Sequence, residues 1–276
     1  AAPTTPKKRE VPENDGYRLT KRTRILKDKL GKFIRLHSEW FRESRWDEFV
    51  RRIRKRGDLE VQQNGREDSH PALGLLKTFQ RTGVPVVMST PPWGLKKRTM
   101  HVRRGAHQSC KDHLELIRTE MLDFVEQGYW MVLPYSLVRY HPHLPLPPLG
   151  VVPQRERRPP LIVDYTFNGV NDDTVKMMPP EAMQFGRTLE RVLYAVHHAN
   201  PHHGPVYVAK TDMADGFYRV PLSTSGIPKL GVILPRFPNE EQLVAFPLVL
   251  PMGWVESPPA FCATTETVAD LANNLH

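Results

Sequence analysis

The sequence predicts an α+β fold, because helical and hairpin patterns both occur and do not alternate regularly. Residues 109–127 and 186–199 carry apolar side chains at helical spacing. Residues 150–163 instead contain two short apolar runs around a charged turn, which is the pattern of a β-hairpin. A doubly wound sheet would need strands and helices in regular succession, so we do not expect one.

Length and composition are those of an ordinary globular protein. The 276 residues are 39% hydrophobic and 25% charged, which suits one large domain or two small ones. No apolar run approaches the roughly 20 residues of a membrane span, and the N-terminus lacks the apolar core of a secretory signal. The two cysteines, Cys110 and Cys262, lie far apart, which argues against a disulfide scaffold. We expect an intracellular protein, cytoplasmic or nuclear, without a signal peptide or a membrane partner.

Positive charge is concentrated near the N-terminus. Residues 1–56 contain 18 Lys and Arg against 8 Asp and Glu, a net charge of +10, whereas the whole chain carries +9. The rest of the chain therefore carries a net charge of −1. A basic arm on a near-neutral body indicates a polyanionic partner, most often a nucleic acid. The alternative is a solvated basic helix or linker.

The first third of the chain is predicted to hold little regular structure. We expect residues 1–58 to form a basic arm, with a disordered tail over 1–24 and one or two amphipathic helices after it. The aromatic residues of these helices could stack on bases, but packing within a small helical element is favoured. Residues 59–105 are predicted to form an irregular linker with extended pieces, because they are polar at first and then interrupted by Pro and Gly.

The predicted helix over 109–127 has signals at both ends. Ser109 and Asp112 fit a capping box, in which each side chain satisfies a free backbone N–H of the first turn. Gly128 is a natural stop, because glycine accepts the left-handed conformation that ends many helices. The helix over 186–199 is expected to end at Asn200-Pro201.

Strands and a last helix complete the predicted body. The hairpin pairs residues 150–152 with 161–163 around a basic turn. Strand-like runs follow at 206–212, 230–234 and 242–249, and a final helix starts near Ser257, with Pro258 in its first turn.

One segment, PVYVAKTDMADGFYRVPL over 205–222, places Asp212 at the end of an apolar strand. A carboxylate held there can face a cleft while its backbone stays fixed, which suits a metal ligand in phosphoryl transfer. The carbonyl oxygen of Met213 could supply a second ligand to a hard cation. Taken alone, the segment is better interpreted as a strand before an Asp215-Gly216 turn, with Asp212 solvated.

Two other segments have candidate binding residues. LVAFPLVLPMGWVESPPAF, over 243–261, contains Gly253, which would let a backbone approach a ligand closely. RRPPLIVDYTFNGVN, over 157–171, places two arginines before a strand that carries Asp164 and Tyr165. Each segment alone is an ordinary turn or hairpin.

Together and in this order, the three segments resemble the reverse transcriptase family, whose members are RNA-directed DNA polymerases. The resemblance is strongest to gypsy-type LTR retrotransposons and retroviral polymerases, and it covers about residues 106–276. Three ordered motifs are far more specific than one. The resemblance implies the fingers and a partial palm of a right-hand polymerase, with Mg²⁺ or Mn²⁺ as cofactor. The implied partners are an RNA or DNA primer–template, dNTPs and other domains of a Pol polyprotein.

The resemblance also implies roles for Asp212 and the residues that follow it. Asp212 matches the first catalytic aspartate of the palm, which binds metal together with the carbonyl of Met213. Phe217 matches the aromatic steric gate that excludes a 2′-OH on the incoming sugar. The backbone of Met213, Ala214 and Asp215 would lie near the triphosphate.

At other positions of the implied nucleotide site, this sequence departs from the family's usual residues. Met252 and Gly253 match nucleotide-pocket positions, although retroviruses usually have Gln at the place of Met252. The family has its triphosphate-binding arginine four residues before the strand aspartate, where this chain has Pro160. Three nearby residues could take that role, since a guanidinium fits phosphate oxygens: Arg155, Arg157 and Arg158.

The family's Y/F-x-D-D motif is expected downstream of the last helix and does not occur there in this sequence. Because two-metal chemistry needs those carboxylates, we expect the 276-residue chain not to polymerise, and its lack of an initiator Met indicates part of a longer chain. One alternative is a non-catalytic nucleic-acid-binding relic of a retroelement. Another is a viral RNA-dependent polymerase, which Phe217 disfavours. The histidines at 197–198 and 202–203 could bind metal, but a solvated loop is favoured.

Overall fold

The computed structural model describes residues 20–54, 73–154, 158–178, 188–207 and 213–273. Helices and antiparallel sheets both occur, so the predicted α+β class is confirmed. The central sheet has three antiparallel strands in the order β1 (Trp130–Pro134), β5 (Leu243–Pro247) and β4 (Val232–Ile233). None of the helices in the described ranges is both long and apolar enough to cross a membrane.

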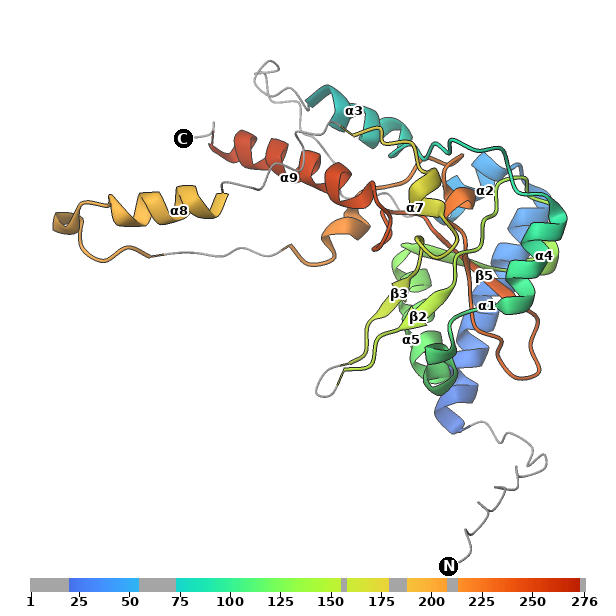
Figure 1. The fold of residues 1–276 in the computed structure, drawn as a ribbon. Coiled ribbons are helices and arrows are strands. Elements are labelled where there is room, and N and C mark those ends of the chain that lie inside the picture. Colours follow the sequence, from blue (N-terminus) through green and yellow to red (C-terminus); the bar gives the residue numbers. More distant parts are fainter. Residues whose placement is uncertain (1–19, 55–72, 155–157, 179–187, 208–212, 274–276) are drawn as a thin grey trace, which may run out of the picture.

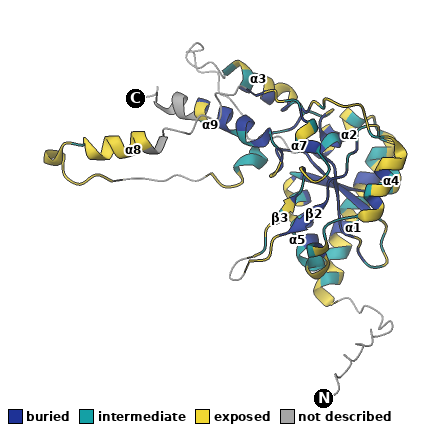
Figure 2. Ribbon diagram, in the orientation of Figure 1, coloured by how far each residue is buried: buried dark blue, intermediate teal, exposed yellow. Residues whose placement is uncertain are grey.

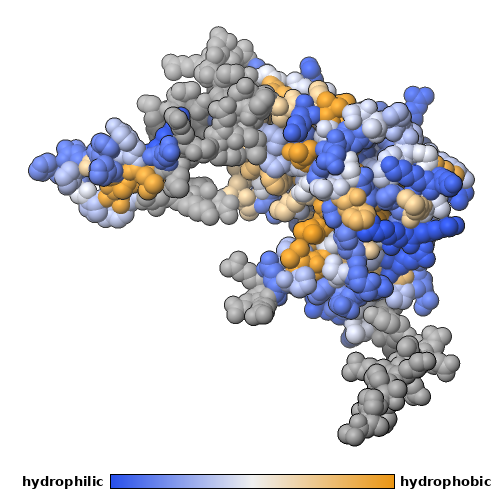
Figure 3. Space-filling model, viewed as in Figure 1, coloured by the Kyte–Doolittle hydropathy of each residue, from blue (hydrophilic) through white to orange (hydrophobic). Residues whose placement is uncertain are grey.

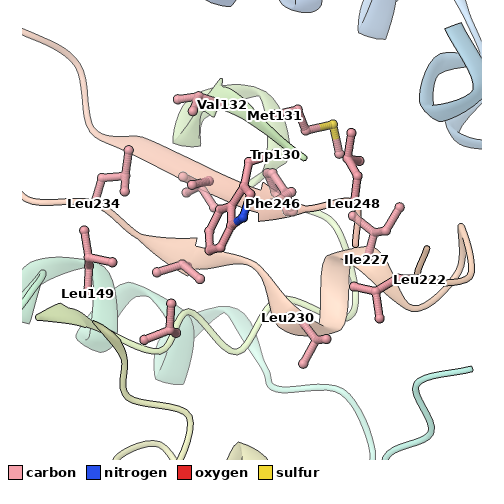
Figure 4. Close-up of a cluster of buried hydrophobic side chains, with 14 of the residues drawn as sticks. Trp130, Met131, Val132, Leu149, Leu222, Ile227, Leu230, Leu234, Phe246 and Leu248 are labelled. Atoms are coloured by element: carbon pink, nitrogen blue, oxygen red, sulfur yellow. The ribbon is translucent and has the colours of Figure 1, made fainter. Parts of the chain in front are cut away.

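The core lies on the central strand β5, because all five of its residues are buried. Ala245 is opposite Val132 of β1 on one side and Val232 of β4 on the other. The predicted strands over 230–234 and 242–249 are thereby confirmed in part, since residues 227–230 form the 3₁₀ helix η5 (Ile227–Leu230). Figure 4 shows the buried side chains around this sheet: Trp130, Met131, Val132, Leu149, Leu222, Ile227, Leu230, Leu234, Phe246 and Leu248.

The N-terminal helices α1 (Lys21–Glu43) and α2 (Trp46–Ile53) confirm the amphipathic prediction and belong to the main body. Helix α1 packs against β1 and α5, and Phe49 of α2 is fully buried. The predicted tail is wrong for residues 21–24, which form the first turn of α1 behind the capping side chain of Thr20. The rest of the tail lies outside the described residues.

Aromatic packing between α1 and α2 confirms the favoured interpretation of this region. The rings of Phe41, Trp46 and Phe49 lie 5.4–6.2 Å apart in edge-on or tilted pairs, which is a favourable geometry for aromatic rings. Trp46 also donates an indole hydrogen bond to the carbonyl of Thr224. Phe49 is buried, and Phe41 and Trp46 are partly buried against the core, as expected for packing within a small helical element.

The predicted irregular linker over 59–105 is wrong at two places, which are helices α3 (Leu73–Thr82) and α4 (Leu95–Arg104). Helix α3 buries Leu76 and Phe79, and α4 buries Val102. Tertiary packing therefore stabilises helices whose own sequence signal is weak. Between them the chain is extended, as predicted, and pairs in single bridges with Leu222 and Thr174. Residues 55–72 lie outside the described part.

The capping box predicted at Ser109 is wrong. Residues 108–113 form the 3₁₀ helix η1 (Gln108–His113), and helix α5 (Leu114–Gln127) begins after it without a side-chain cap. The Ser109 hydroxyl instead accepts the backbone N–H of Val151, which ties the hairpin to this segment. The predicted stop is confirmed, because Gly128 adopts the left-handed conformation with a φ of 74°.

The predicted hairpin is confirmed as strands β2 (Leu149–Val151) and β3 (Leu161–Val163), with Gly150 opposite Ile162. Its tip, residues 155–157, lies outside the described residues. The predicted last helix is confirmed as α9 (Ser257–Asn273). The structure also contains four short helical elements: α6 (Tyr135–Val138), α7 (Val170–Asp173), η3 (Pro201–His203) and η4 (Gly216–Arg219).

Helix α8 (Thr188–His197) confirms the helix predicted over 186–199 but projects away from the body (Figure 1). Its apolar side chains remain exposed, as Figures 2 and 3 show: Val192, Leu193, Tyr194 and Val196. The predicted strand over 206–212 is absent at residues 206–207. Its remaining residues, 208–212, lie outside the described part.

Candidate functional site

The turn that contains Met252 and Gly253 packs against strand β3. Gly253 has a φ of 93°, and a Cβ atom at this position would lie 2.7 Å from the carbonyl oxygen of Val163. Both the left-handed conformation and this close approach require glycine. The close approach that the sequence predicted for Gly253 is therefore made to the protein's own backbone.

Asn171 fastens this turn to the segment that follows β3. Its side-chain amide donates to the carbonyl oxygen of Gly253 at 3.0 Å, and its side-chain oxygen accepts the N–H of Val255 at 3.0 Å. An asparagine can do this because one side chain offers both donors and an acceptor. Two of the three segments that carry the family resemblance are thus joined by one side chain.

Replacing Asn171 by Ala should therefore loosen the turn. We expect a loss of about 1–2 kcal/mol in the free energy of unfolding, because the hydrogen bonds to Gly253 and Val255 disappear together with a third one, to the Thr166 hydroxyl. Urea unfolding followed by circular dichroism measures this. Asn171→Asp can still accept from Val255 but cannot donate to Gly253, so its stability should be intermediate. Unfolding of Asn171→Ala at the wild-type urea concentration would contradict the assignment.

Three further residues stabilise the turn by hydrogen bonds. Trp254 is 1% exposed, and its indole N–H donates to the hydroxyl of Thr174 at 3.1 Å. Glu256 is also buried, and one carboxylate oxygen accepts the backbone N–H groups of Met177 and Met178 at 2.7 and 2.9 Å. The Ser257 hydroxyl donates to the carbonyl of Pro251, where α9 begins.

The third segment meets the same helix, α9. A Cβ atom on Gly216 would lie 2.6 Å from the ring of Phe261, and the ring of Phe217 packs edge-on against Phe261 with 5.0 Å between centroids. Residues 220–222 then run beside residues 248–250, where Leu250 donates to the carbonyl of Val220. The structure therefore brings Phe217 and the Met252–Gly253 turn onto one framework.

Two tyrosines pack next to this framework, of which Tyr165 is buried and Tyr218 is half-buried. Tyr165, directly after β3, is fully buried and donates its hydroxyl to the carbonyl of Leu230. Burial raises its pKa well above the usual value. Tyr218 packs between Phe124 and Tyr129, and burial, followed by the nearby Asp215, raises its pKa to about 12. Both phenols are neutral at physiological pH and serve packing.

The predicted nucleotide-binding residues that can be placed are mostly open to solvent. Met213 is 46% exposed and Met252 is 55% exposed. Ala214 and Asp215 are also exposed, whereas Phe217 is half-buried. Asp215 has a φ of 55°, the left-handed conformation that leads the chain into η4. Asp212, the predicted catalytic residue, lies outside the described residues.

Arg158 pairs with an acidic residue in this structure. Arg158 directly follows the hairpin tip in the sequence, and its guanidinium forms an ion pair with the Glu120 carboxylate of α5. Burial raises the pKa of Glu120, while Arg158 acts in the opposite direction. A triphosphate would have to compete with Glu120 for this guanidinium. Arg155 and Arg157, the other two predicted cations, lie in the part that the structure does not describe.

Candidate metal ligands are sparse within the described residues. No three His, Cys, Asp or Glu side chains of that part are grouped so that they could hold a metal ion. The histidines of the predicted loop are exposed, and the ring of His198 stacks on Tyr194.

A cavity of about 350 Å³ lies elsewhere, between residues 88–97, 143–145 and 168–173. It contains none of the predicted site residues. Asp173 is held at its wall by the hydroxyl groups of Ser89 and Thr90, and these hydrogen bonds lower the pKa of the Asp173 carboxyl although burial acts to raise it.

Sequence reasoning missed the positioning residues Asn171, Thr174 and Glu256. Glu256 had a recognisable signal, since an acidic residue between Trp254 and an apolar helix is unusual unless it is hydrogen-bonded. No protein-family model matches this chain, and a search of curated proteins found no match.

Proposed function

We propose that this chain is part of an RNA-directed DNA polymerase of a retroelement, in which residues 106–276 form the fingers and part of the palm. The observation that carries the proposal is the meeting of three sequence-distant motifs. The described parts of the three segments that resemble reverse transcriptase motifs, residues 163–171, 213–220 and 250–261, pack on one another through Asn171, Gly216 and Phe261. If the three resemblances had arisen by chance, there would be no reason for the three segments to be neighbours in the fold.

The proposed roles follow from this arrangement. Mg²⁺, when bound, would neutralise charge on the triphosphate and activate the attacking hydroxyl, and Asp212 with the Met213 carbonyl would be its ligands on this chain. The half-buried ring of Phe217 is fixed against Phe261, so it could exclude a 2′-OH by contact without moving aside. Met252 is exposed at the turn and would contact the nucleotide through apolar atoms.

Primer extension tests the proposal directly. The full encoded polypeptide that contains this chain should extend a DNA primer on an RNA template in the presence of Mg²⁺ and dNTPs. The isolated 276-residue chain should give no product, because two-metal transfer needs more carboxylates than Asp212. If the full polypeptide binds primer–template but gives no product, the non-catalytic relic replaces this proposal.

The steric role of Phe217 gives a specific prediction. Phe217→Ala in the full polypeptide should raise the incorporation of ribonucleotides relative to deoxynucleotides by about a hundredfold, because a clash with a 2′-OH of roughly 3 kcal/mol disappears. The measurement is the ratio of kcat/KM for dCTP and rCTP in single-nucleotide extension. Tyr140→Ala is the control, since it removes an exposed aromatic ring outside the three segments. An unchanged ratio in Phe217→Ala would count against this role.

A further inference from the structure

Helix α4 presents a strongly basic surface that the polymerase proposal does not use. Its ten residues include six basic ones and no acidic one. Arg98 and Val102 are buried, and the Arg98 guanidinium donates to the carbonyl of His141, so this side docks the helix on the body. The remaining side faces solvent, and Figure 3 shows mostly hydrophilic side chains where Figure 1 places α4.

Two aromatic rings extend this surface at the two ends of the helix. Lys97, His101 and Arg104 share one face of α4, because they are spaced by four and three residues. At one end the Lys97 amine lies 3.7 Å from the ring centre of Trp93, which also contacts His101. At the other end the Arg104 guanidinium lies 3.4 Å from the ring centre of Phe167. These five residues are called the α4 basic face.

The cations of this face are available to an anion. Lys97 and Arg104 are exposed, and neither forms an ion pair with an acidic side chain of the described residues. Desolvation, Lys97 and Arg104 together lower the pKa of His101, which keeps that imidazole neutral near pH 7. The Asp173 carboxylate near Lys97 is already held by Ser89 and Thr90.

Alternating cations and rings indicate one kind of partner. Lys97 and Arg104 are two helical turns apart, about 10 Å along the helix. Two cations at this spacing suit a partner that carries several negative charges. The rings add to this argument, because Phe167 is 46% exposed although the Arg104 guanidinium covers one face of its ring, so a flat group can stack on the side that Arg104 leaves open. Proteins that bind single strands combine backbone-binding cations with stacking aromatics in this way. An acidic peptide has no regular flat groups, and a duplex keeps its bases inside.

We propose that the α4 basic face binds single-stranded nucleic acid, with phosphates on Lys97 and Arg104 and a base on Phe167. The face ends at the cavity of about 350 Å³, whose wall includes Trp93, Lys97 and Asn168. That volume lies at the lower end of the range for small-ligand pockets, so the cavity can receive a further base. Binding at this face does not rest on the polymerase assignment.

Fluorescence anisotropy with the complete 276-residue chain tests the charged half of the proposal. The probe is a labelled 12-nucleotide oligouridylate in EDTA, which keeps metal-dependent chemistry out of the measurement. In Lys97→Gln/Arg104→Gln, the slope of log affinity against log salt should become shallower by about 1.4, since each single-strand phosphate contact contributes about 0.7. The control Arg81→Gln/Arg191→Gln removes two exposed arginines from α3 and α8 and should leave the slope unchanged.

The stacking half is tested by Phe167→Leu. This variant should bind oligouridylate about tenfold more weakly than the wild type does, with an unchanged salt slope. Its affinity for an abasic strand of 12 nucleotides should equal that of the wild type. Equal slopes in the two charge variants would overturn the proposal. So would equal affinity for a 12-base-pair RNA duplex, or tighter binding to phosphatidylserine vesicles that the Lys97→Gln/Arg104→Gln change abolishes. Loss of primer extension with this binding intact would count against the polymerase alone.

Discussion

Replacing Asp212 by Asn in the full encoded polypeptide is expected to lower the rate of templated primer extension about a thousandfold or more. The carboxylate would be a direct ligand of the metal that stabilises charge on the transferring phosphoryl group, and an amide cannot replace that charge. Single-turnover extension with saturating primer–template measures the rate of chemistry. Primer–template affinity should change little, because the proposed role is in chemistry.

Asp28→Asn is the matched control for this prediction. Asp28 is an exposed aspartate of α1, distant in sequence from the three motifs, and its loss changes the net charge by the same amount. The control should extend primers at the wild-type rate. If Asp212→Asn retained more than a tenth of the wild-type rate, Asp212 would not be a catalytic metal ligand and the polymerase proposal would lose its centre.

Replacing Trp254 by Ala is expected to reduce the free energy of unfolding by about 3–5 kcal/mol. The side chain is 1% exposed, and truncation of a buried aromatic residue removes transfer energy and leaves a cavity. This is a large fraction of the total for a typical domain, so the variant should be only marginally folded. Urea unfolding followed by far-ultraviolet circular dichroism measures the loss independently of tryptophan fluorescence.

Trp254→Phe separates packing from hydrogen bonding at this position. Phenylalanine keeps most of the apolar contact but cannot donate to the Thr174 hydroxyl, so a loss of about 1–2 kcal/mol is expected. If Trp254→Ala lost less than about 1 kcal/mol, the turn would not depend on the packing beneath it.

Elements with a complete local signal could be predicted from the sequence. The helix over 114–127 shows helical spacing and a glycine stop, and α9 begins at Ser257 with a proline in its first turn. The antiparallel hairpin was predicted from two apolar runs around a charged turn, with residues 150–152 opposite 161–163, and the structure pairs residues 149–151 with 161–163. In each case, neighbouring residues alone carry the information.

Elements that depend on distant partners could not be predicted in this way. Helix α4 buries Val102 but has no other buried aliphatic side chain, so its sequence shows no apolar face. Ser109 has the side chain of a helix cap, but its hydroxyl accepts a hydrogen bond from the backbone N–H of Val151, which is 42 residues away. At the candidate site the motifs identified Gly253 and Phe217, whereas the contacts of Asn171 and Glu256 join positions about 80 residues apart.

Two of the three side-chain hydrogen bonds of Asn171 have a mechanical consequence. The side chain, which belongs to α7, reaches residues 82 and 84 positions downstream, so displacing α7 relative to the 252–255 turn would break both of these bonds. If a nucleotide binds beside this turn as proposed, α7 and the turn would move together as long as those hydrogen bonds hold. Residues 213–217 have no hydrogen bond to Asn171, so in the proposed site they could move without breaking either bond.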